Sequence, residues 1–277
     1  MALTNSENHL LLAEILFADS KKVWYGAGNR SNPEYKKWLA TSDDVPMPPE
    51  RVAADVPRNF DLEFLREMGS DVARMAEYLR DVAMYIGSGS SRLVFAVSPR
   101  MVVKLAGGSS LDAGRGGRWA DQMVKAGRYQ NRHEFKLWEK HGRQDVVGRL
   151  LPRCFDIADD GSWLLSELVR PVKDEGEFMA LTGLDEDGYY RLMNTLERGG
   201  FGIEYAKNFV ADMEGDGESS AKALSFVLLM QRLQAREPWL KVGDLGSMEQ
   251  WGKGSDGRLV ILDTGADETL IKRYYDE

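Results

Sequence analysis

The chain has 277 residues, 43% of them hydrophobic, which is enough for one large domain or two lobes with a proper core. Its formal net charge of −8 argues against a general nucleic-acid-binding coat and against a polybasic membrane surface. The single cysteine, Cys154, excludes an intrachain disulfide and lies in an apolar run that favours a small buried residue over a nucleophile. Without a secretory leader pattern or a long apolar run, the sequence predicts a cytoplasmic protein that does not enter a membrane.

Residues 1–80 are predicted to form a helical extension that carries no chemical motif. Residues 6–18 are typical of a helix, and residues 40–58 hold four prolines and are typical of an extended linker. Residues 60–80 carry apolar side chains at helical spacing, and we expect this stripe to pack against the rest of the chain because its exposure would be costly. The stripe consists of Phe60, Leu62, Leu65, Met68, Val72, Met75 and Leu79.

Residues 81–170 are predicted to form a compact α+β lobe of five strands, with one helix inserted after the third strand. Turn-forming residues separate the first three strands, and an Asp-Asp-Gly turn joins the last two. The expected elements are three short strands within 85–106, a glycine-rich loop at 107–117, a helix at 121–141, and strands at 150–157 and 163–169.

Residues 171–277 are predicted to be mostly helical. The clear helices are 187–198 and 219–236, of which the second is strongly apolar and should be central to its lobe. It should end before Pro238, because proline cannot continue a helix. A short apolar strand at 259–262 then leads directly into Asp263.

Three features of the first lobe have the residue types that phosphoryl transfer from ATP requires. The turn Gly87–Ser91 has glycines that would let backbone amides approach phosphate oxygens, although a plain hairpin turn explains it as well. Lys104 is a single charge in an apolar strand, and it is either a phosphate ligand or a side chain reaching out from an edge strand. Glu134 interrupts an apolar helix face and is preferred over Glu139 as the partner of the lysine, the alternative being a solvated helix face.

Two acids in the second half complete the set. Asp263 follows an apolar strand and precedes Thr264-Gly265, which places it at a strand end as a metal ligand or as a turn-forming aspartate. Asp244, nineteen positions upstream in the segment VGDLG, is the candidate acid that orients the acceptor. None of these residues is decisive alone, but their order along the chain is the order that the chemistry requires.

In these segments the sequence resembles the protein-kinase-like superfamily, and most closely the short kinase-like proteins of tailed bacteriophages. The resemblance covers about residues 83–266 and implies a two-lobed fold in which 81–170 form the first lobe and 171–277 a reduced, mostly helical second lobe. The matching segments are IGSGSSRLVFAV, VVKLA, QNRHEF, WLLSELVRPV, GDLGSMEQWG and VILDTG.

The resemblance implies a role for each matching residue, with ATP and magnesium as cofactors. The loop residues Gly87, Ser88, Gly89 and Ser90 would cover the phosphates, and Lys104, held by Glu134, would contact them. The backbone from Glu167 to Val169 would bind adenine. Asp244 would be the catalytic base, Asp263 the main magnesium ligand, and Gln250 would stand near the second metal position.

The chain also departs from the pattern of active kinases, so two functions stay open. Arg92 replaces the third glycine of the loop, Gln250 stands where an asparagine is usual, and no activation segment follows Gly265. The first reading is an ATP- and magnesium-dependent phosphotransferase that acts on a protein or small-molecule hydroxyl. The alternative is a non-catalytic kinase-like protein of a phage or virion, with other phage or host proteins bound through the N-terminal helices and a place in the host cytoplasm or the virion.

Overall fold

We analysed the fold in a computed structural model of the chain. The structure describes residues 60–274 except 99, 109–110, 112–116, 143–145, 199–201, 212–216, 239–244, 246, 255 and 265–267. The helix expected at 6–18 and the linker expected at 40–58 lie outside the described residues.

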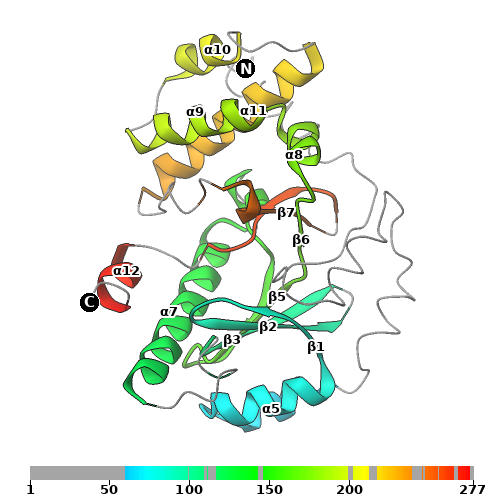
Figure 1. The fold of residues 1–277 in the computed structure, drawn as a ribbon, viewed down its shortest axis with the longest axis vertical. Coiled ribbons are helices and arrows are strands. Elements are labelled where there is room, and N and C mark those ends of the chain that lie inside the picture. Colours follow the sequence, from blue (N-terminus) through cyan, green and yellow to red (C-terminus); the bar gives the residue numbers. More distant parts are fainter. Residues whose placement is uncertain are drawn as a thin grey trace, which may run out of the picture.

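The fold is α+β, and its largest sheet has five antiparallel strands in the order β1-β2-β3-β5-β4 (Figure 1). Helix α7 follows the third strand and lies along the sheet, so the predicted arrangement of five strands with one inserted helix is confirmed. The elements are β1 (Met84–Ser88), β2 (Arg92–Ser98), β3 (Met101–Ala106), α7 (Arg118–His141), β4 (Cys154–Ile157) and β5 (Trp163–Glu167).

The fourth and fifth strands are shorter than the sequence pattern predicts. The expected strand at 150–157 begins only at Cys154, because Val146–Leu150 form the 3₁₀-helix η1 and Pro152 has no N–H to give to a ladder. Strand β5 ends at Glu167, two residues before the predicted end. Cys154 is buried as expected, and burial raises the pKa of its thiol, which fits a packing role.

The amphipathic stretch at 60–80 forms two helices, α4 (Leu62–Glu67) and α5 (Val72–Val82). Gly69 has a positive φ of 63°, and Asp61 and Asp71 cap the two helices, so the chain stops and restarts between them. The apolar stripe packs on the sheet as expected, since Leu65, Met75 and Leu79 share a hydrophobic cluster with strand residues. The two helices therefore form one core with the five-stranded sheet.

Helix α7 lies so close to the sheet that one position tolerates no side chain. A Cβ at Gly127 would overlap the carbonyl oxygen of Ser91 and would lie 2.8 Å from the Cα of Ala106. This contact brings the inner face of α7 against the start of β2 and the end of β3. The residues on that face are therefore held close to the hairpin between β1 and β2.

We expect Gly127→Ala to lower the free energy of unfolding by about 1–3 kcal/mol, because backbone atoms must shift to admit the new methyl group. Helix propensity alone would make the alanine variant more stable by about 1 kcal/mol. A net loss of stability would therefore be due to the close packing of α7 on the sheet. The measurement is urea unfolding, with Gly89→Ala as the matched control. Gly89 has no positive φ and no described atom within 4 Å of its Cβ position, so this control should unfold like the wild type. A Gly127→Ala protein as stable as the control would contradict the packing.

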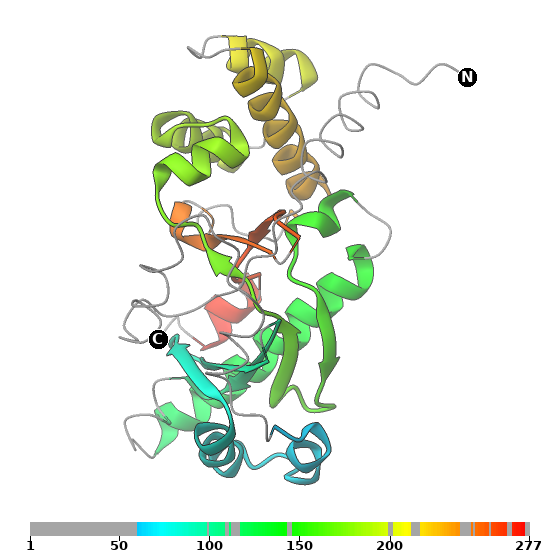
Figure 2. The same ribbon diagram turned by 90° about the vertical axis from the view of Figure 1, so that its right-hand side faces the viewer.

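The second half of the chain builds a three-stranded sheet and a group of helices at the end of the molecule opposite α5 (Figure 2). The helices expected at 187–198 and 219–236 are confirmed, whereas several short elements were missed by the sequence analysis. The order of the small sheet is β6-β7-β8. The elements are β6 (Arg170–Pro171), α8 (Glu175–Thr182), α9 (Glu186–Glu197), α10 (Ile203–Ala211), α11 (Gly217–Arg236), η3 (Met248–Gln250), β7 (Trp251–Lys253), β8 (Leu259–Ile261) and α12 (Glu268–Tyr274).

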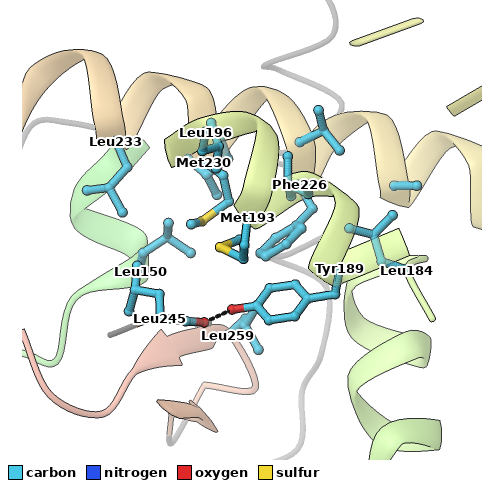
Figure 3. Packing of buried hydrophobic residues seen from close by; sticks show 14 of the residues in the cluster. Leu150, Leu184, Tyr189, Met193, Leu196, Phe226, Met230, Leu233, Leu245 and Leu259 are labelled. Carbon is cyan, nitrogen blue, oxygen red and sulfur yellow. Dashed lines mark hydrogen bonds between the residues drawn. The ribbon is translucent and has the colours of Figure 1, made fainter. Parts of the chain in front are cut away.

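A second hydrophobic cluster holds α8, α9 and α11 together, and Val147 and Leu150 of η1 also belong to it (Figure 3). A polar chain crosses the cluster: the Trp251 indole donates to the Tyr189 hydroxyl at 2.6 Å, and this hydroxyl donates to the carbonyl of Leu245. Leu245 is thereby tied to the helical core. No helix in the described ranges is long and apolar enough to cross a membrane.

Candidate nucleotide-binding pocket

A pocket lies between the hairpin of the large sheet and the end of the small sheet. Its lining combines apolar side chains with two cations and two carboxylates. The lining residues are Gly89, Ser90, Ser91, Arg92, Val94, Val102, Lys104, Gln130, Pro152, Glu167, Val169, Leu262 and Asp263.

Lys104 and Glu134 form the ion pair that the sequence predicts, with 2.5 Å between Nζ and Oε1. Strand β3 is the central strand of the sheet, so Lys104 is not reaching out from an edge. Its side chain is 9% exposed and that of Glu134 is 1% exposed, which excludes a solvated helix face, whereas Glu139 on the same helix is exposed. Lys104 also donates to the carbonyl of Leu262 at 3.3 Å, which connects the large sheet to the residue before Asp263.

The turn Gly87–Ser91, predicted to cover phosphates, is a tight hairpin, and only its tip reaches the pocket. Gly87 and Ser88 belong to β1, while Gly89 donates its N–H to the carbonyl of Arg92 at 2.8 Å and leaves Ser90 and Ser91 at the turn. Gly107 supports the tip from below, since its N–H donates to the carbonyl of Ser91 at 2.7 Å. Described atoms leave open space at the Cβ position of Gly89, so the fold itself does not require a glycine there.

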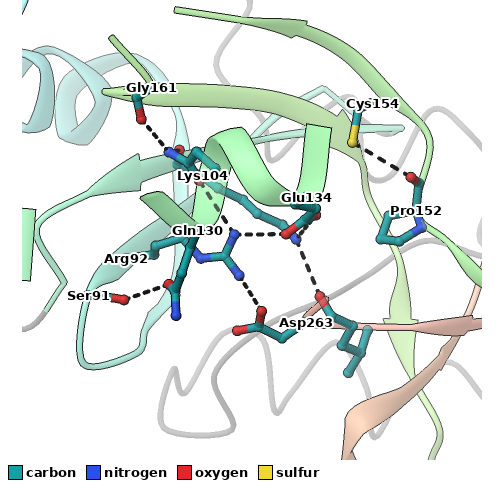
Figure 4. A network of polar contacts seen from close by, with 11 residues as sticks. Ser91, Arg92, Lys104, Gln130, Glu134, Pro152, Cys154, Gly161 and Asp263 are labelled. Carbon is teal, nitrogen blue, oxygen red and sulfur yellow. Dashed lines mark hydrogen bonds and ion pairs between the residues drawn. The ribbon is translucent and has the colours of Figure 1, made fainter. Parts of the chain in front are cut away.

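Arg92 is the main residue that the sequence analysis did not place in the site. Its Nη1 lies 2.8 Å from Glu134 Oε2 and its Nη2 lies 2.7 Å from Asp263 Oδ1, so the guanidinium bridges the two carboxylates (Figure 4). Burial disfavours the charged form, but the charges of Asp263 and Glu134 outweigh it and raise the pKa of Arg92 further above its usual value. Arg92 therefore stays a cation at every pH at which the protein is folded.

Two amides of α7 complete the polar network, and the sequence analysis did not single out their role. Gln130 lines the pocket and accepts a hydrogen bond of 2.6 Å from the Ser91 hydroxyl. Asn131 donates to the carbonyls of Lys104 and Gly161 at 3.1 and 2.9 Å. Because amide side chains are common on exposed helix faces, only the close approach of α7 to the hairpin gives these two residues their position.

The backbone segment expected to bind adenine is a direct link between the two sheets. Strand β5 ends at Glu167 and β6 begins at Arg170, so Leu168 and Val169 alone connect them. The Leu168 N–H donates to the carbonyl of Arg100 at 2.9 Å, whereas no described hydrogen bond uses the N–H of Val169, which lines the pocket. The side chain of Glu167 pairs with Arg258 and its N–H donates to the carbonyl of Arg153 at 2.7 Å, so its carbonyl is the backbone group that it can offer to a flat ring.

The oxygen ligands at the pocket suit a magnesium ion that arrives together with phosphates. Asp263 is 45% exposed and offers one carboxylate, and magnesium is usually held by one or two carboxylates plus substrate phosphates and water. No group of three His, Cys, Asp or Glu side chains in the described residues could hold a metal unaided. The backbone carbonyl of Gln250 accepts from the Leu262 N–H at 2.8 Å, but Gln250 is not among the described lining residues, and Asp244 lies outside them.

No protein-family model, curated protein or solved structure matches the chain.

Proposed function

We propose that the chain is a two-lobed, protein-kinase-like phosphotransferase that binds ATP with magnesium in this pocket and transfers the γ-phosphate to a hydroxyl of a protein or small molecule. The observation that carries the proposal is the buried Lys104–Glu134 pair, which puts a cation from β3 beside the tip of a glycine-containing hairpin and beside Asp263. A buried lysine is costly unless it is paired, so its retention in a pocket favours a role with an anion.

The two sides of the pocket suit the two ends of ATP. Strand pairing sets Met101 opposite Glu167 and Arg92 opposite Ala106, so the sheet link and the hairpin tip lie at opposite ends of β3. Adenine would lie between Val94, Val102 and Leu262 near the unused N–H of Val169, and the phosphates would extend toward Lys104 and the hairpin. Bound magnesium would neutralise phosphate charge, and Asp263 is the carboxylate that would hold it.

Transfer then requires a group that positions the acceptor hydroxyl. In the proposed reaction the acceptor oxygen bonds to the γ-phosphorus, the bond to the ADP oxygen breaks, and Asp244 accepts the hydroxyl proton. The neighbouring Leu245 accepts a hydrogen bond at its carbonyl from the Tyr189 hydroxyl in the helical core. Incubation of the full chain with γ-labelled ATP and magnesium, alone and with candidate acceptors, should place label on the chain or on an acceptor.

Asp244→Asn should abolish transfer, by about 10²–10⁴-fold, and should leave the affinity for ATP unchanged, because the carboxylate acts on the acceptor and not on the nucleotide. The rate of label transfer and a calorimetric titration with ATP measure the two quantities separately. Asp187→Asn is the matched control, since Asp187 is an exposed residue on α9. Unchanged transfer by Asp244→Asn would contradict the role of this residue.

The Arg92–Asp263 contact favours a second candidate function, a nucleotide-binding protein without catalysis. A guanidinium already occupies one oxygen of Asp263, the carboxylate proposed to hold magnesium. A chain of this kind would keep the fold as a scaffold for other proteins. Saturable ATP binding without label transfer or ATP hydrolysis, in magnesium or in manganese, would select this candidate.

A further inference from the structure

We propose that Arg92 takes the charge-neutralising place of a divalent cation in nucleotide binding: its guanidinium leaves Asp263 for the phosphates, so that affinity depends little on metal. This inference rests on the proposed nucleotide pocket, but it concerns a residue that stands where kinase-like loops have a glycine. It applies equally to a catalytic and to a non-catalytic protein.

Contacts of both the backbone and the side chain fix the position of Arg92. It is the first residue of β2, directly after the hairpin tip, and its backbone carbonyl closes the turn with Gly89. Its side chain is 7% exposed and is held by Glu134, with Asn131 Oδ1 at 3.4 Å from Nη1. A guanidinium with so little freedom is already ordered before a ligand arrives, which lowers the entropic cost of binding.

The guanidinium keeps donors for a ligand. Arginine has five N–H donors in a planar fork. Two acceptors engage Nη1 and one engages Nη2, which leaves Nε–H and the second hydrogen of Nη2 without a partner among the described residues. Arg92 lines the pocket, next to Ser90 and Lys104, where the phosphates of a nucleotide would lie. Such a planar pair of donors suits a phosphate.

The two carboxylates bound to Arg92 differ in how readily they can be exchanged. Glu134 is buried and is shared with Lys104, so it should stay in place when a ligand binds. Asp263 is 45% exposed, so its carboxylate can be rehydrated when it leaves the guanidinium, whereas that of the buried Glu134 cannot. A phosphate that enters the pocket can therefore replace Asp263 at the guanidinium and leave its carboxylate to solvent or to a metal ion.

The formal charges in the site also favour this role for Arg92. The ion-pair network contains Lys104 and Arg92 against Glu134 and Asp263, so its formal charges sum to zero until Asp263 leaves the guanidinium, and in most nucleotide sites a divalent metal offsets the phosphates. Within the described residues no cluster of ligands would hold such a metal before the nucleotide arrives. Arg92 supplies a permanent positive charge at the same carboxylate, so a metal adds little to affinity.

The test is calorimetry of the full chain with the non-hydrolysable ATP analogue AMP-PNP, in excess EDTA and in excess magnesium. The wild type should bind with affinities within about threefold of each other in the two conditions. Arg92→Gln should lose about 10- to 100-fold in EDTA, the loss of one charge-assisted hydrogen-bonded contact, and should recover most of it in magnesium. Arg132→Gln, an exposed arginine on α7, is the control and should behave like the wild type.

Asp263→Asn keeps the inference testable if Arg92→Gln does not fold. It removes the competing carboxylate, so it should bind in EDTA at least as tightly as the wild type and gain nothing from magnesium. Wild-type binding that requires magnesium by more than about tenfold, or an equal loss by Arg92→Gln in both conditions, would overturn the role of Arg92. Absence of AMP-PNP binding in every condition would overturn the nucleotide pocket as well.

Discussion

Replacing Glu134 with alanine is expected to lower the free energy of unfolding by about 3–5 kcal/mol, the largest stability effect of any single change in the pocket. Glu134 is 1% exposed and contacts Lys104 Nζ at 2.5 Å and Arg92 Nη1 at 2.8 Å. Its removal leaves two buried cations beside each other without the carboxylate that both share. Asp263 and the Leu262 carbonyl compensate for this only in part.

Urea unfolding of the full chain measures this effect, and Glu139→Ala is the matched control. Glu139 lies on the same helix but is exposed, so its removal should change the free energy of unfolding by less than about 0.5 kcal/mol. Glu134→Gln keeps the size and one acceptor oxygen and should lie between the two. Equal stability of Glu134→Ala and Glu139→Ala would show that the buried network does not form.

Replacing Lys104 with methionine is expected to weaken ATP binding by about 10- to 100-fold while the protein stays folded. Methionine fills most of the space of the lysine stem in the central strand, and Glu134 keeps Arg92 as its partner, so no buried charge is left alone. The affinity falls because one of the two pocket cations is lost. If the wild type transfers phosphate, the rate should fall by about 10²–10³-fold, as for the loss of one preorganised charge in a site.

The matched control for this change is Lys136→Met, which removes an exposed lysine from α7 and changes the net charge by the same amount. Calorimetry with ATP reports the affinity, and circular dichroism reports the fold of each variant. A Lys104→Met protein that binds ATP as tightly as Lys136→Met would mean that the nucleotide does not contact Lys104.

The Lys104–Glu134 pair could be predicted because both residues break an apolar pattern, one in a strand and one on a helix face. A charged side chain in a buried element is costly unless it is paired, so each of the two residues is expected to have a partner. The division of the helix at 60–80 was also visible in principle, because Gly69 and Asp71 are a helix stop and a helix cap in succession. The apolar residues recur at helical spacing across the whole of 60–80, and this regular spacing concealed the two signals.

The role of Arg92 could not be predicted in the same way. Its contacts depend on the close approach of α7 at Gly127 and on the position of Asp263 after β8, and both residues lie far from Arg92 along the chain. The short strands β6 and β7 were missed because two or three residues give no period to recognise. The α+β architecture and the ion pair thus follow from local patterns, whereas the bridge between Glu134 and Asp263 follows only from tertiary contacts.

Hydrogen–deuterium exchange of the full chain, with and without saturating ATP, tests the central claim most directly because it shows where the nucleotide lies. The account predicts slower exchange in peptides that cover the hairpin at 85–94 and the sheet link at 163–172, since both line the pocket. Lys104→Met should show this protection only at higher ATP concentration. Unchanged exchange in both segments at saturating ATP, or protection confined to another part of the chain, would contradict a nucleotide site between the two sheets.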